Sequence, residues 1–493
     1  MNSKVKMIAL VAGPLLFVIL QLLGRPDSMP AGAFDVLCIT LWMAVWWVSE
    51  AIPIAVTALL PIILFPLTGA VSIDATTAAF GHKYVFLYLG GFILAVAIEK
   101  WDLHRRIALS IINFIGADVK MIILGFMAAT AFLSMWISNT ATSVMMLPIG
   151  TAIISQLQDN PASKENENAI FGKALMLAIA YSASIGGVAT LIGTPPNLVF
   201  AGIVEEIYGI EISFTKWIVL GLPVSVALLL ICWKYLTTRA FRFTQSEFPG
   251  GKAEIKRLKM ELGGMSLQEK RVLVVFTITA FCWISRSYLI QPVLPFIDDT
   301  IIAMIAAVAL FLIPAGKKNR KLVTWEEAVK IPWGIILLFG GGMALAKGFG
   351  ESGLAVWIGE QLKNLENLPL LLLVVILIAA VNFLTEVTSN LATTAMLLPI
   401  LASMALALDL HPYFLMVGAT LAASCAFMLP VATPPNAVVF GSGYLRIPDM
   451  IKTGIWMNIV SILLLSLIVY YLLPYLWDFD PEVIPKKFLK AED

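Results

Sequence analysis

The chain has 493 residues, of which 59% are hydrophobic and only 13% are charged, and its formal net charge at pH 7 is +1. Soluble domains carry about 25% charged residues, whereas apolar stretches long enough to cross a bilayer recur along this whole chain. This composition excludes a soluble multidomain protein, and the balanced charge argues against a nucleic-acid partner, which would need a basic face. We expect an all-α polytopic membrane protein whose outer surface contacts lipid.

Apolar runs and the breakers between them predict the elements of the first half. Lys4 and Lys6 precede the first run and no small-residue cleavage site follows it, so this helix is expected to be retained. In chain order we expect helices over about 5–24, 33–52, 54–70 and 84–100, an amphipathic interfacial piece over 102–115, short apolar arms over 119–136 and 141–157, a broken helix over 170–203 and a helix over 216–237. The arms are at the short limit for spanning, so a re-entrant hairpin over 119–157 competes with two full spans.

The second half repeats this order after a charged connection. We expect helices over 272–290, 298–314 and 331–349, an amphipathic piece over 351–366, arms over 368–387 and 391–408, a broken helix over 412–440 and a last helix over 451–475. With re-entrant hairpins the chain has about 11 transmembrane helices. The predicted units are an N-terminal helix region (1–32), a first repeat (33–238), a connection (239–271), a second repeat (272–476) with its hairpin over 368–408, and a C-terminal tail (477–493).

Two motifs occur once in each half, inside apolar sequence. Ser138–Ile149 returns as Ser389–Ile400 with eight of twelve positions identical, and Gly193–Asn197 returns as Ala432–Asn436. Polar side chains and helix breakers at membrane depth are tolerated only where they line a cavity enclosed by protein. Corresponding interruptions in two halves of a membrane protein indicate the binding site of a secondary transporter. An odd number of spans in each repeat would invert the second repeat relative to the first.

The distribution of lysine and arginine predicts the orientation in the membrane. The connection 239–271 carries eight of them and 317–321 carries four, whereas 205–211, 298–299 and 351–366 are acidic. Eleven spans place the N-terminus and the basic loops in the cytoplasm and the C-terminus outside. If each hairpin instead crossed the membrane twice, the termini and the basic loops would stay on the same sides. Charge alone therefore does not distinguish the two hairpin models.

The repeated motifs supply uncharged oxygen atoms, which a hard cation such as sodium prefers. Ser134 lies four residues before Ser138, so a helical arm places both hydroxyls on one face, and the second half repeats this spacing. Prolines bar continuation of each broken helix and free carbonyl groups for an ion. The two candidate sodium sites are Ser134, Ser138, Asn139 and Gly193 in the first repeat, and Thr385, Ser389, Asn390 and Ala432 in the second.

An anionic substrate is expected between these sites. The helix N-terminus at a hairpin tip favours anions, and no lysine or arginine lies in the four motifs, so bound sodium would supply positive charge. The candidate substrate contacts are Ser138, Asn139, Thr140, Thr194, Ser389, Asn390 and Thr433. Singly, each motif is an ordinary helix cap or breaker, and only the paired occurrence favours function. Glu386 is either a functional intramembrane carboxylate or a brace for the hairpin backbone.

Other chemistry has no candidate residues. The four cysteines and three histidines are scattered, without the close spacing that a metal cluster needs. We therefore do not expect an enzyme, and an ion channel would need a continuous pore rather than an enclosed site.

The paired motifs, together with the segment that carries Trp46, Trp47, Glu50 and Pro53, resemble the divalent anion/sodium symporter family (DASS) over essentially the whole chain. The resemblance implies a homodimer of eleven-helix protomers, working as an elevator in which hairpins and broken helices form the mobile domain. It also implies the two sodium sites and the substrate contacts named above. One departure is Leu391, where bacterial dicarboxylate carriers usually have threonine.

The expected function is sodium-coupled import of a C4-dicarboxylate such as succinate, malate or fumarate across a bacterial inner membrane. The alternatives within the family are a dicarboxylate or citrate exchanger and a sodium-coupled citrate or sulfate transporter. An exchanger can replace coupling cations with fixed positive side chains, and the uncharged ligand sets here favour sodium.

Overall fold

The computed structural model describes residues 3–116, 118–156, 167–243, 251–316, 320–362 and 368–488. The regular elements in these ranges are helices, and the described residues contain no β-strand. Nine described helical segments are long and apolar enough to cross a membrane, and five shorter apolar helices accompany them. The all-α membrane fold predicted from composition is therefore confirmed.

The helices of the first half follow the predicted order. They are α1 (Ser3–Leu23), α2 (Ala31–Ser49), α3 (Ile54–Thr57), α4 (Leu60–Thr68), α5 (Ile73–Phe80), α6 (Lys83–Lys100), α7 (Leu103–Ile115), α8 (Val119–Ser134), α9 (Asn139–Gln156), α10 (Glu167–Gly187), α11 (Pro195–Tyr208) and α12 (Phe214–Tyr235).

The second half adds a further set of helices after the connection. They are α13 (Gly251–Glu261), α14 (Leu267–Ser285), α15 (Asp299–Leu312), α16 (Trp325–Ala328), α17 (Trp333–Glu351), α18 (Leu354–Leu362), α19 (Leu370–Thr385), α20 (Asn390–Ala407), α21 (Pro412–Ala423), α22 (Pro434–Phe440), α23 (Ile447–Leu467) and α24 (Leu473–Trp477). Short π-helical turns, at Leu236–Ala240, Arg286–Ile290 and Ile468–Leu472, continue α12, α14 and α23.

Three of these helices were missed by the sequence analysis, namely α5, α13 and α16. Helix α5 has a local signal, because the Ser72 hydroxyl accepts a hydrogen bond from the Ala75 amide as an N-cap. Parts of the predicted segments lie outside the described residues: 1–2, 117, 157–166, 244–250, 317–319, 363–367 and 489–493.

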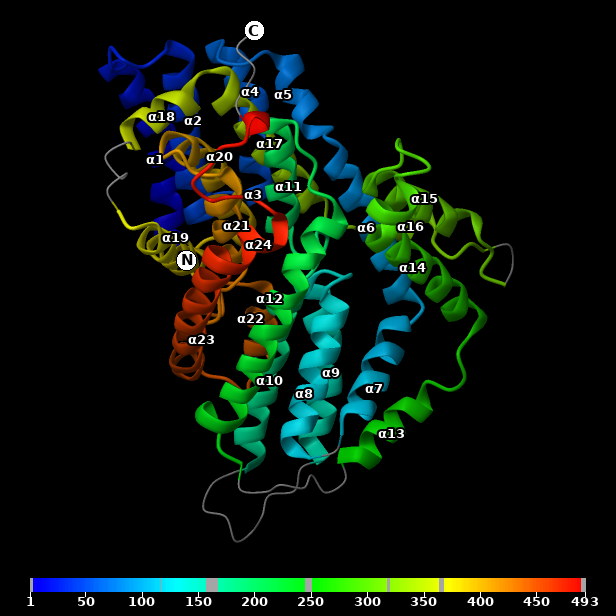
Figure 1. Ribbon diagram of the computed structural model, residues 1–493. Helices are drawn as coiled ribbons and strands as arrows, with labels where there is room; N and C mark the ends of the chain where they lie inside the picture. Colours follow the sequence, from blue (N-terminus) through cyan, green and yellow to red (C-terminus); the bar gives the residue numbers. More distant parts are fainter. Residues whose placement is uncertain are drawn as a thin grey trace.

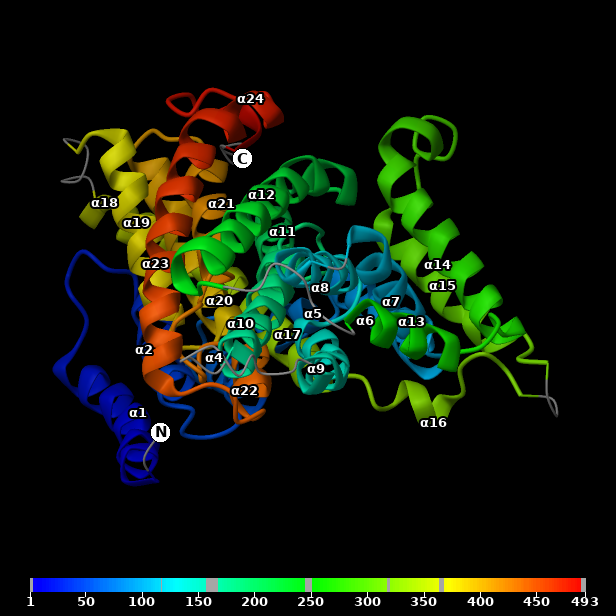
Figure 2. The ribbon, with the colours of Figure 1, turned by 90° about the horizontal axis from the view of Figure 1, so that it is seen from below.

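The order of elements from α6 to α12 recurs from α17 to α23. In each series a long helix is followed by a shorter one (α7 or α18), a helical pair joined by a tight reversal, a broken helix and another long helix. The pairs and broken helices of the two series pack across each other, since α10 and α9 contact α22, and α11 contacts α20 and α21. Figure 1 shows α8, α9 and α10 side by side, and Figure 2 shows the same bundle from below.

A close backbone contact joins the first hairpin to its broken helix. A Cβ atom on Gly186 of α10 would lie 2.3 Å from the Ala131 carbonyl oxygen of α8, so only glycine allows this approach. Helix α8 ends at Ser134 and α9 begins at Asn139, while α19 ends at Thr385 and α20 begins at Asn390. Each four-residue reversal therefore ends at the first residue of the repeated motif, Ser138 or Ser389.

Ion pairs form two groups, which we call the acidic group, around Glu205 and Glu206, and the basic group, around Lys100 and Glu327. In the acidic group, Lys83 pairs with Glu205 at 2.6 Å and Lys347 with Glu206 at 3.1 Å, which ties the end of α11 to α6 and α17. In the basic group, the Lys100 ammonium lies 2.5 Å from Glu327. The acidic segments are linked through these lysines, since Lys83 also lies 4.0 Å from Asp298 and Lys347 lies 3.4 Å from Glu351.

Arg286 forms the most deeply buried ion pairs of the acidic group. Its side chain is 2% exposed and lies 2.5 Å from a Glu211 carboxylate oxygen and 2.8 Å from an Asp299 carboxylate oxygen. Asp299 also accepts a hydrogen bond from the Phe214 amide at 2.7 Å. These contacts join the π-turn after α14 to α15 and to the start of α12.

We expect Arg286→Met to destabilise the protein by about 3–5 kcal/mol, because it leaves the buried Asp299 carboxylate and the partly exposed Glu211 carboxylate without their cation. Arg320→Met is the matched control, since Arg320 is 50% exposed and pairs with Glu327, and an exposed pair contributes only about 0–1 kcal/mol. Thermal unfolding in detergent measures both. Equal unfolding midpoints for the two variants would contradict the structural role of Arg286.

Candidate functional site

The tip of the first hairpin lies against the break in the first broken helix. The Ser134 hydroxyl, at the end of α8, donates to the Ala183 carbonyl oxygen of α10 at 2.7 Å and lies 2.6 Å from Asn139 Oδ1. That amide position also lies 3.1 Å from the Gly193 carbonyl oxygen and 3.2 Å from the Ala183 carbonyl oxygen. One hydroxyl, one amide and two carbonyl oxygens therefore converge at this point.

The Asn139 side-chain amide can adopt two orientations at this point, and each orientation needs different partners. With Oδ1 inward, the amide oxygen faces other oxygen atoms, and a cation among them would satisfy all of these acceptors. With the amide reversed, its NH2 group donates to Ser134 Oγ, the Gly193 carbonyl and the Ala183 carbonyl. The cluster consists of uncharged oxygen atoms, which are the ligands that a hard cation prefers.

The second repeat has the same arrangement of a hydroxyl, an amide and a carbonyl. The Thr385 hydroxyl, at the end of α19, lies 2.6 Å from Asn390 Oδ1 and donates to the Ala423 carbonyl oxygen of α21 at 3.1 Å. Thr385 and Asn390 correspond to Ser134 and Asn139 in the repeated motif. The geometry around the two hairpin tips is thus duplicated, as the sequence is.

The asparagine that ends each proline motif supports the break, a role that the sequence analysis did not assign. Asn197 Nδ2 donates to the carbonyl oxygens of Gly187, Val188 and Thr190, at 3.2, 3.3 and 2.7 Å. Asn436 Nδ2 donates to the carbonyl oxygens of Ala426 and Leu429, at 3.4 and 3.0 Å. The buried Oδ1 atom of each asparagine has no hydrogen-bond partner in the described part of the chain. The recurrence of asparagine at this position was the available signal.

The two breaks differ in the space available beside the ligand cluster. A Cβ atom on Gly187 would lie 2.6 Å from Asn139 Oδ1 and 3.0 Å from the Gly193 carbonyl oxygen. A Cβ atom on Gly193 would lie 2.4 Å from the Gly187 carbonyl oxygen. The corresponding positions of the second repeat hold Ala426 and Ala432. The first cluster is therefore the more tightly packed of the two.

Glu386 braces the second break, which decides between the two interpretations of this carboxylate in favour of backbone support. One of its oxygen atoms accepts from the amides of Phe427 and Met428 at 2.7 and 2.9 Å, and the other accepts from the Leu429 amide at 3.0 Å. Asn458 Nδ2 of α23 donates to the same carboxylate at 2.7 Å. The side chain is 3% exposed, and its contacts satisfy three backbone donors of the unwound segment.

The first break is held differently. Met135 occupies the position of Glu386, and its carbonyl oxygen accepts a hydrogen bond from the Thr190 hydroxyl at 2.5 Å. The Thr190 hydroxyl in turn accepts from the Gly193 amide at 3.1 Å. A hydroxyl and a backbone carbonyl thus join the first hairpin tip to its break, where the second repeat uses a carboxylate.

The other candidate residues have varied surroundings. The Ser138 hydroxyl accepts from the Ala141 amide at 3.3 Å, and the Thr433 hydroxyl accepts from the Asn436 amide at 3.4 Å, so both cap helices. Thr194 is buried at the start of α11. Three candidate residues differ in exposure: Thr140 is exposed, Ser389 is half-buried and Ala432 is buried.

Leu391, the departure from the family pattern, is only 5% exposed. The corresponding Thr140 of the first repeat is exposed. The two motifs therefore present different surfaces after the asparagine, and a side chain at position 391 meets protein rather than open space in this conformation.

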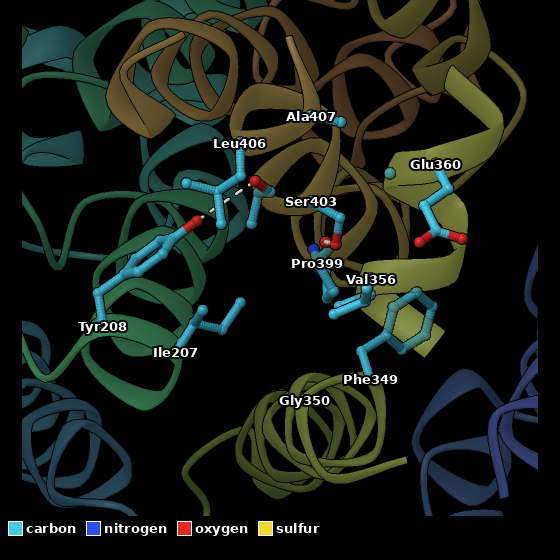
Figure 3. Close-up of a pocket in the computed structure, with 13 residues that line it drawn as sticks. Ile207, Tyr208, Phe349, Gly350, Val356, Glu360, Pro399, Ser403, Leu406 and Ala407 are labelled. Atoms are coloured by element: carbon cyan, nitrogen blue, oxygen red, sulfur yellow. Dashed lines mark hydrogen bonds between the residues drawn. The ribbon is translucent and has the colours of Figure 1, made fainter. Parts of the chain in front are cut away.

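Two cavities lie between helices of the described chain, away from the oxygen clusters. One of about 330 Å³ lies between α11, α17, α18 and α20, and Figure 3 shows Tyr208, Val356 and Leu406 around it, with Glu360 at its edge. Another of about 240 Å³ lies between α7, α9 and α13. Pro399 lines the first and Pro148 lines the second. These prolines are equivalent in the repeated motif, so the cavities mark where a short helix meets a hairpin in each repeat.

Comparisons with known proteins agree with the repeated motifs. A family model described as "Sodium:sulfate symporter transmembrane region" matches residues 3–477. The sodium-dependent dicarboxylate transporter SdcS of Staphylococcus saprophyticus is 47% identical over 481 residues, covering 96% of this chain and 93% of the relative. SdcS of Staphylococcus aureus strain USA300 is 47% identical over 484 residues, covering 97% and 93%.

Two solved structures share the fold at low sequence identity. The YdaH transporter of Alcanivorax borkumensis is 12% identical, with a TM-score of 0.57 over 82% of this chain and 89% of that chain. MtrF of Neisseria gonorrhoeae is also 12% identical, with a TM-score of 0.59 over 92% and 98%. Both comparisons bear on the arrangement of helices alone, and both proteins are membrane transporters.

We expect Glu386→Gln to destabilise the second break by about 1.5–3 kcal/mol, because the amide NH2 would face a backbone donor and the charged acceptor is lost. Hydrogen exchange of the amides at 427–429 should accelerate. Glu360→Gln is the matched control, since Glu360 is an exposed carboxylate on α18. Unchanged protection at 427–429 in the Glu386→Gln protein would show that the carboxylate does not hold this segment.

Proposed function

The chain belongs to the sodium:sulfate symporter family, and from this premise we propose that it is a sodium-coupled symporter that imports C4-dicarboxylates such as succinate, malate or fumarate. The observation that carries the proposal is the pair of uncharged oxygen clusters at the two hairpin tips. The names of the SdcS relatives, which include sodium and dicarboxylate, support the choice of ion and substrate.

The first sodium ion binds, in this proposal, among the oxygen atoms of Ser134, Ser138, Asn139 and Gly193, with the Ala183 carbonyl as an added ligand. When sodium is absent, the Asn139 amide reverses and its NH2 group satisfies the same oxygens. Support comes from the 2.6–3.2 Å separations around this amide. The reversal exchanges an acceptor for a donor, so the oxygen atoms of Ser134, Ala183 and Gly193 have a partner in both the empty and the occupied state.

The second sodium ion binds, by the same reasoning, among the oxygen atoms of Thr385, Ser389, Asn390 and Ala432, with the Ala423 carbonyl nearby. Support comes from the Thr385, Asn390 and Ala423 contacts, which repeat those of the first cluster. The buried amide oxygen of Asn436, which lacks a donor among the described residues, is one more acceptor at this break.

The dicarboxylate lies between the two ions. Helices α9 and α20 begin at Asn139 and Asn390, so their free amides and positive dipole ends favour a carboxylate at each tip. Hydroxyl groups of Ser138, Thr140, Thr194, Ser389 and Thr433 complete the proposed contacts. Because the motifs contain no lysine or arginine, the sodium charge is needed before the dianion binds.

Transport follows an elevator mechanism in this proposal, with the hairpins and broken helices moving together against the other helices. Support comes from the cross-packing of α9 and α10 with α22 and of α11 with α20, which makes the two halves of the site one body. The Lys83–Glu205 and Lys347–Glu206 pairs join this body to α6 and α17. We further propose a homodimer in a bacterial inner membrane, with the N-terminus cytoplasmic and the C-terminus outside.

Uptake of labelled succinate into proteoliposomes tests the function. We expect uptake to require an inward sodium gradient and to be abolished by Asn139→Ala and by Asn390→Ala, since each removes an amide proposed to serve ion and substrate. If more than two sodium ions accompany each dianion, uptake will also respond to membrane potential, by about 2.3 kcal/mol per excess charge and 100 mV.

The same assay separates the alternatives. Equal uptake with choline in place of sodium would contradict symport and favour anion exchange. Preferential uptake of citrate or sulfate over succinate would contradict the assigned substrate while leaving sodium coupling intact.

We expect Gly187→Ala to raise the sodium concentration needed for half-maximal uptake by tenfold or more, because the new methyl group would lie 2.6 Å from Asn139 Oδ1. Ala426→Gly is the matched variant at the corresponding position of the second repeat, where no atom is added, and it should change that concentration much less. Sodium titration of succinate uptake measures both. Equal effects of the two changes would show that the cluster at the first tip does not bind the ion.

A further inference from the structure

A cavity of about 530 Å³ with both polar and apolar lining lies at the junction of α7 and α13, away from the proposed transport site. It is lined by Asn113 of α7, by Lys256, Lys259 and Met260 of α13, and by Gly263. Figures 1 and 2 show α13 beside α7, and the two helices are in contact. This helix belongs to the connection between the repeats and has no counterpart in the duplicated series.

Helix α13 is amphipathic, and its basic face lines the cavity. Ile255 is buried, while Leu258 and Leu262, three and seven residues further on, are half-buried against the rest of the protein. Lys256 and Lys259 lie on the adjoining face, at the spacing that brings side chains together on a helix. Helices with this division of basic and apolar faces lie in the plane of a membrane surface.

The two cavity lysines differ from Arg106 and Arg257, each of which pairs with a carboxylate in the described part of the chain. Lys256 and Lys259 form no ion pair with any described residue. Arg257, on another face of α13, is matched by Glu254 and Glu261. Hydrogen bonds from Arg257 lower the pKa of the Glu254 carboxyl, which keeps that acid ionised beside its own partner. Within the described ranges, the cavity therefore carries two positive charges that no carboxylate pairs with.

Arg106 fixes the shape of the cavity without contributing free charge to it. Its guanidinium donates to the Glu269 carboxylate at 2.7 Å and to the carbonyl oxygens of Leu262 and Gly263 at 3.2 and 3.1 Å. These bonds attach the turn after α13 to α7, so the two walls of the cavity are held together. Glu269 neutralises the positive charge of Arg106.

Large apolar side chains project beside the charged cavity. Phe114, next to Asn113, is 89% exposed, and Met260, next to Lys259, is 65% exposed. Such exposure suits side chains that contact hydrocarbon, while the lysines and the Asn113 amide suit phosphate oxygens. A ligand with an anionic head and apolar chains satisfies both halves of the surface.

We propose that this cavity binds the phosphate headgroup of an anionic phospholipid, with Lys256, Lys259 and Asn113 contacting the headgroup and Phe114 and Met260 contacting the acyl chains. The bound lipid joins α7 to the connection between the repeats. The proposal stands independently of the transported substrate, since none of these residues belongs to the oxygen clusters.

Native mass spectrometry of the full-length protein, titrated with phosphatidylglycerol, tests the proposal. Each lysine near an anionic headgroup contributes about a fivefold gain in binding, so the double variant Lys256→Gln, Lys259→Gln should bind the first phosphatidylglycerol about 25-fold more weakly. The control double variant Lys270→Gln, Lys330→Gln removes two exposed lysines elsewhere and should bind as the unmodified protein does. Equal losses in both double variants, or none in the cavity variant, would overturn the site.

Phe114→Ser and inorganic phosphate distinguish a lipid from a free anion. For a lipid site, Phe114→Ser weakens phosphatidylglycerol binding severalfold, and excess inorganic phosphate does not displace the lipid. Phosphatidylethanolamine, which has no net charge, should bind with equal strength to the unmodified protein and to the cavity variant. Complete displacement by phosphate together with unchanged binding in Phe114→Ser would overturn the assignment of a lipid.

Discussion

Backbone groups that lose their helical partners inside a membrane must find new ones within the protein, and this constraint governs the structure around both helix breaks. Asn197 and Asn436 each donate from one side-chain amide to the carbonyl groups of the unwound segment. Their burial is complete, so these bonds form without competition from water. The breaks are stable because the asparagine side-chain amides donate hydrogen bonds to carbonyl groups that have no partner within a helix.

Besides the carbonyl groups bound by these asparagines, other carbonyl groups of the broken helices contact the hairpin tips. At the first tip, the Ala183 and Gly193 carbonyls lie near Ser134 and Asn139. At the second, the Ala423 carbonyl lies near Thr385. The same physical requirement therefore produces both the stability of the unwound segments and the concentration of oxygen atoms beside them.

The two repeats have diverged in how they meet this requirement. The first uses two glycines, whose lack of a Cβ atom permits carbonyl oxygens and the Asn139 amide to pack within van der Waals distance. The second has alanines at those positions and uses the buried carboxylate of Glu386, which binds three consecutive amides. A carboxylate surrounded by backbone donors and an asparagine amide is stable at this depth because its charge is distributed over four hydrogen bonds.

The sequence by itself determined the membrane class, the duplicated order of elements and the positions of the hairpin tips. Apolar length and breaker spacing are local properties, so the predicted arms ended within a few residues of α8, α9, α19 and α20. The likeness of the two motifs was visible because identical residues recur at matching places in the two halves.

Only the tertiary structure decided what these residues touch. The partners of Ser134 and Thr385 on α10 and α21 lie 49 and 38 residues away, and sequence spacing cannot specify which carbonyl a side chain reaches. Likewise, Glu386 could have been a ligand or a brace until its three amide partners were placed beside it, because a carboxylate's role depends on its neighbours. The short helix α13 lies in the charged connection, where the sequence analysis expected no helix, and the structure shows that it packs against α7 and α9.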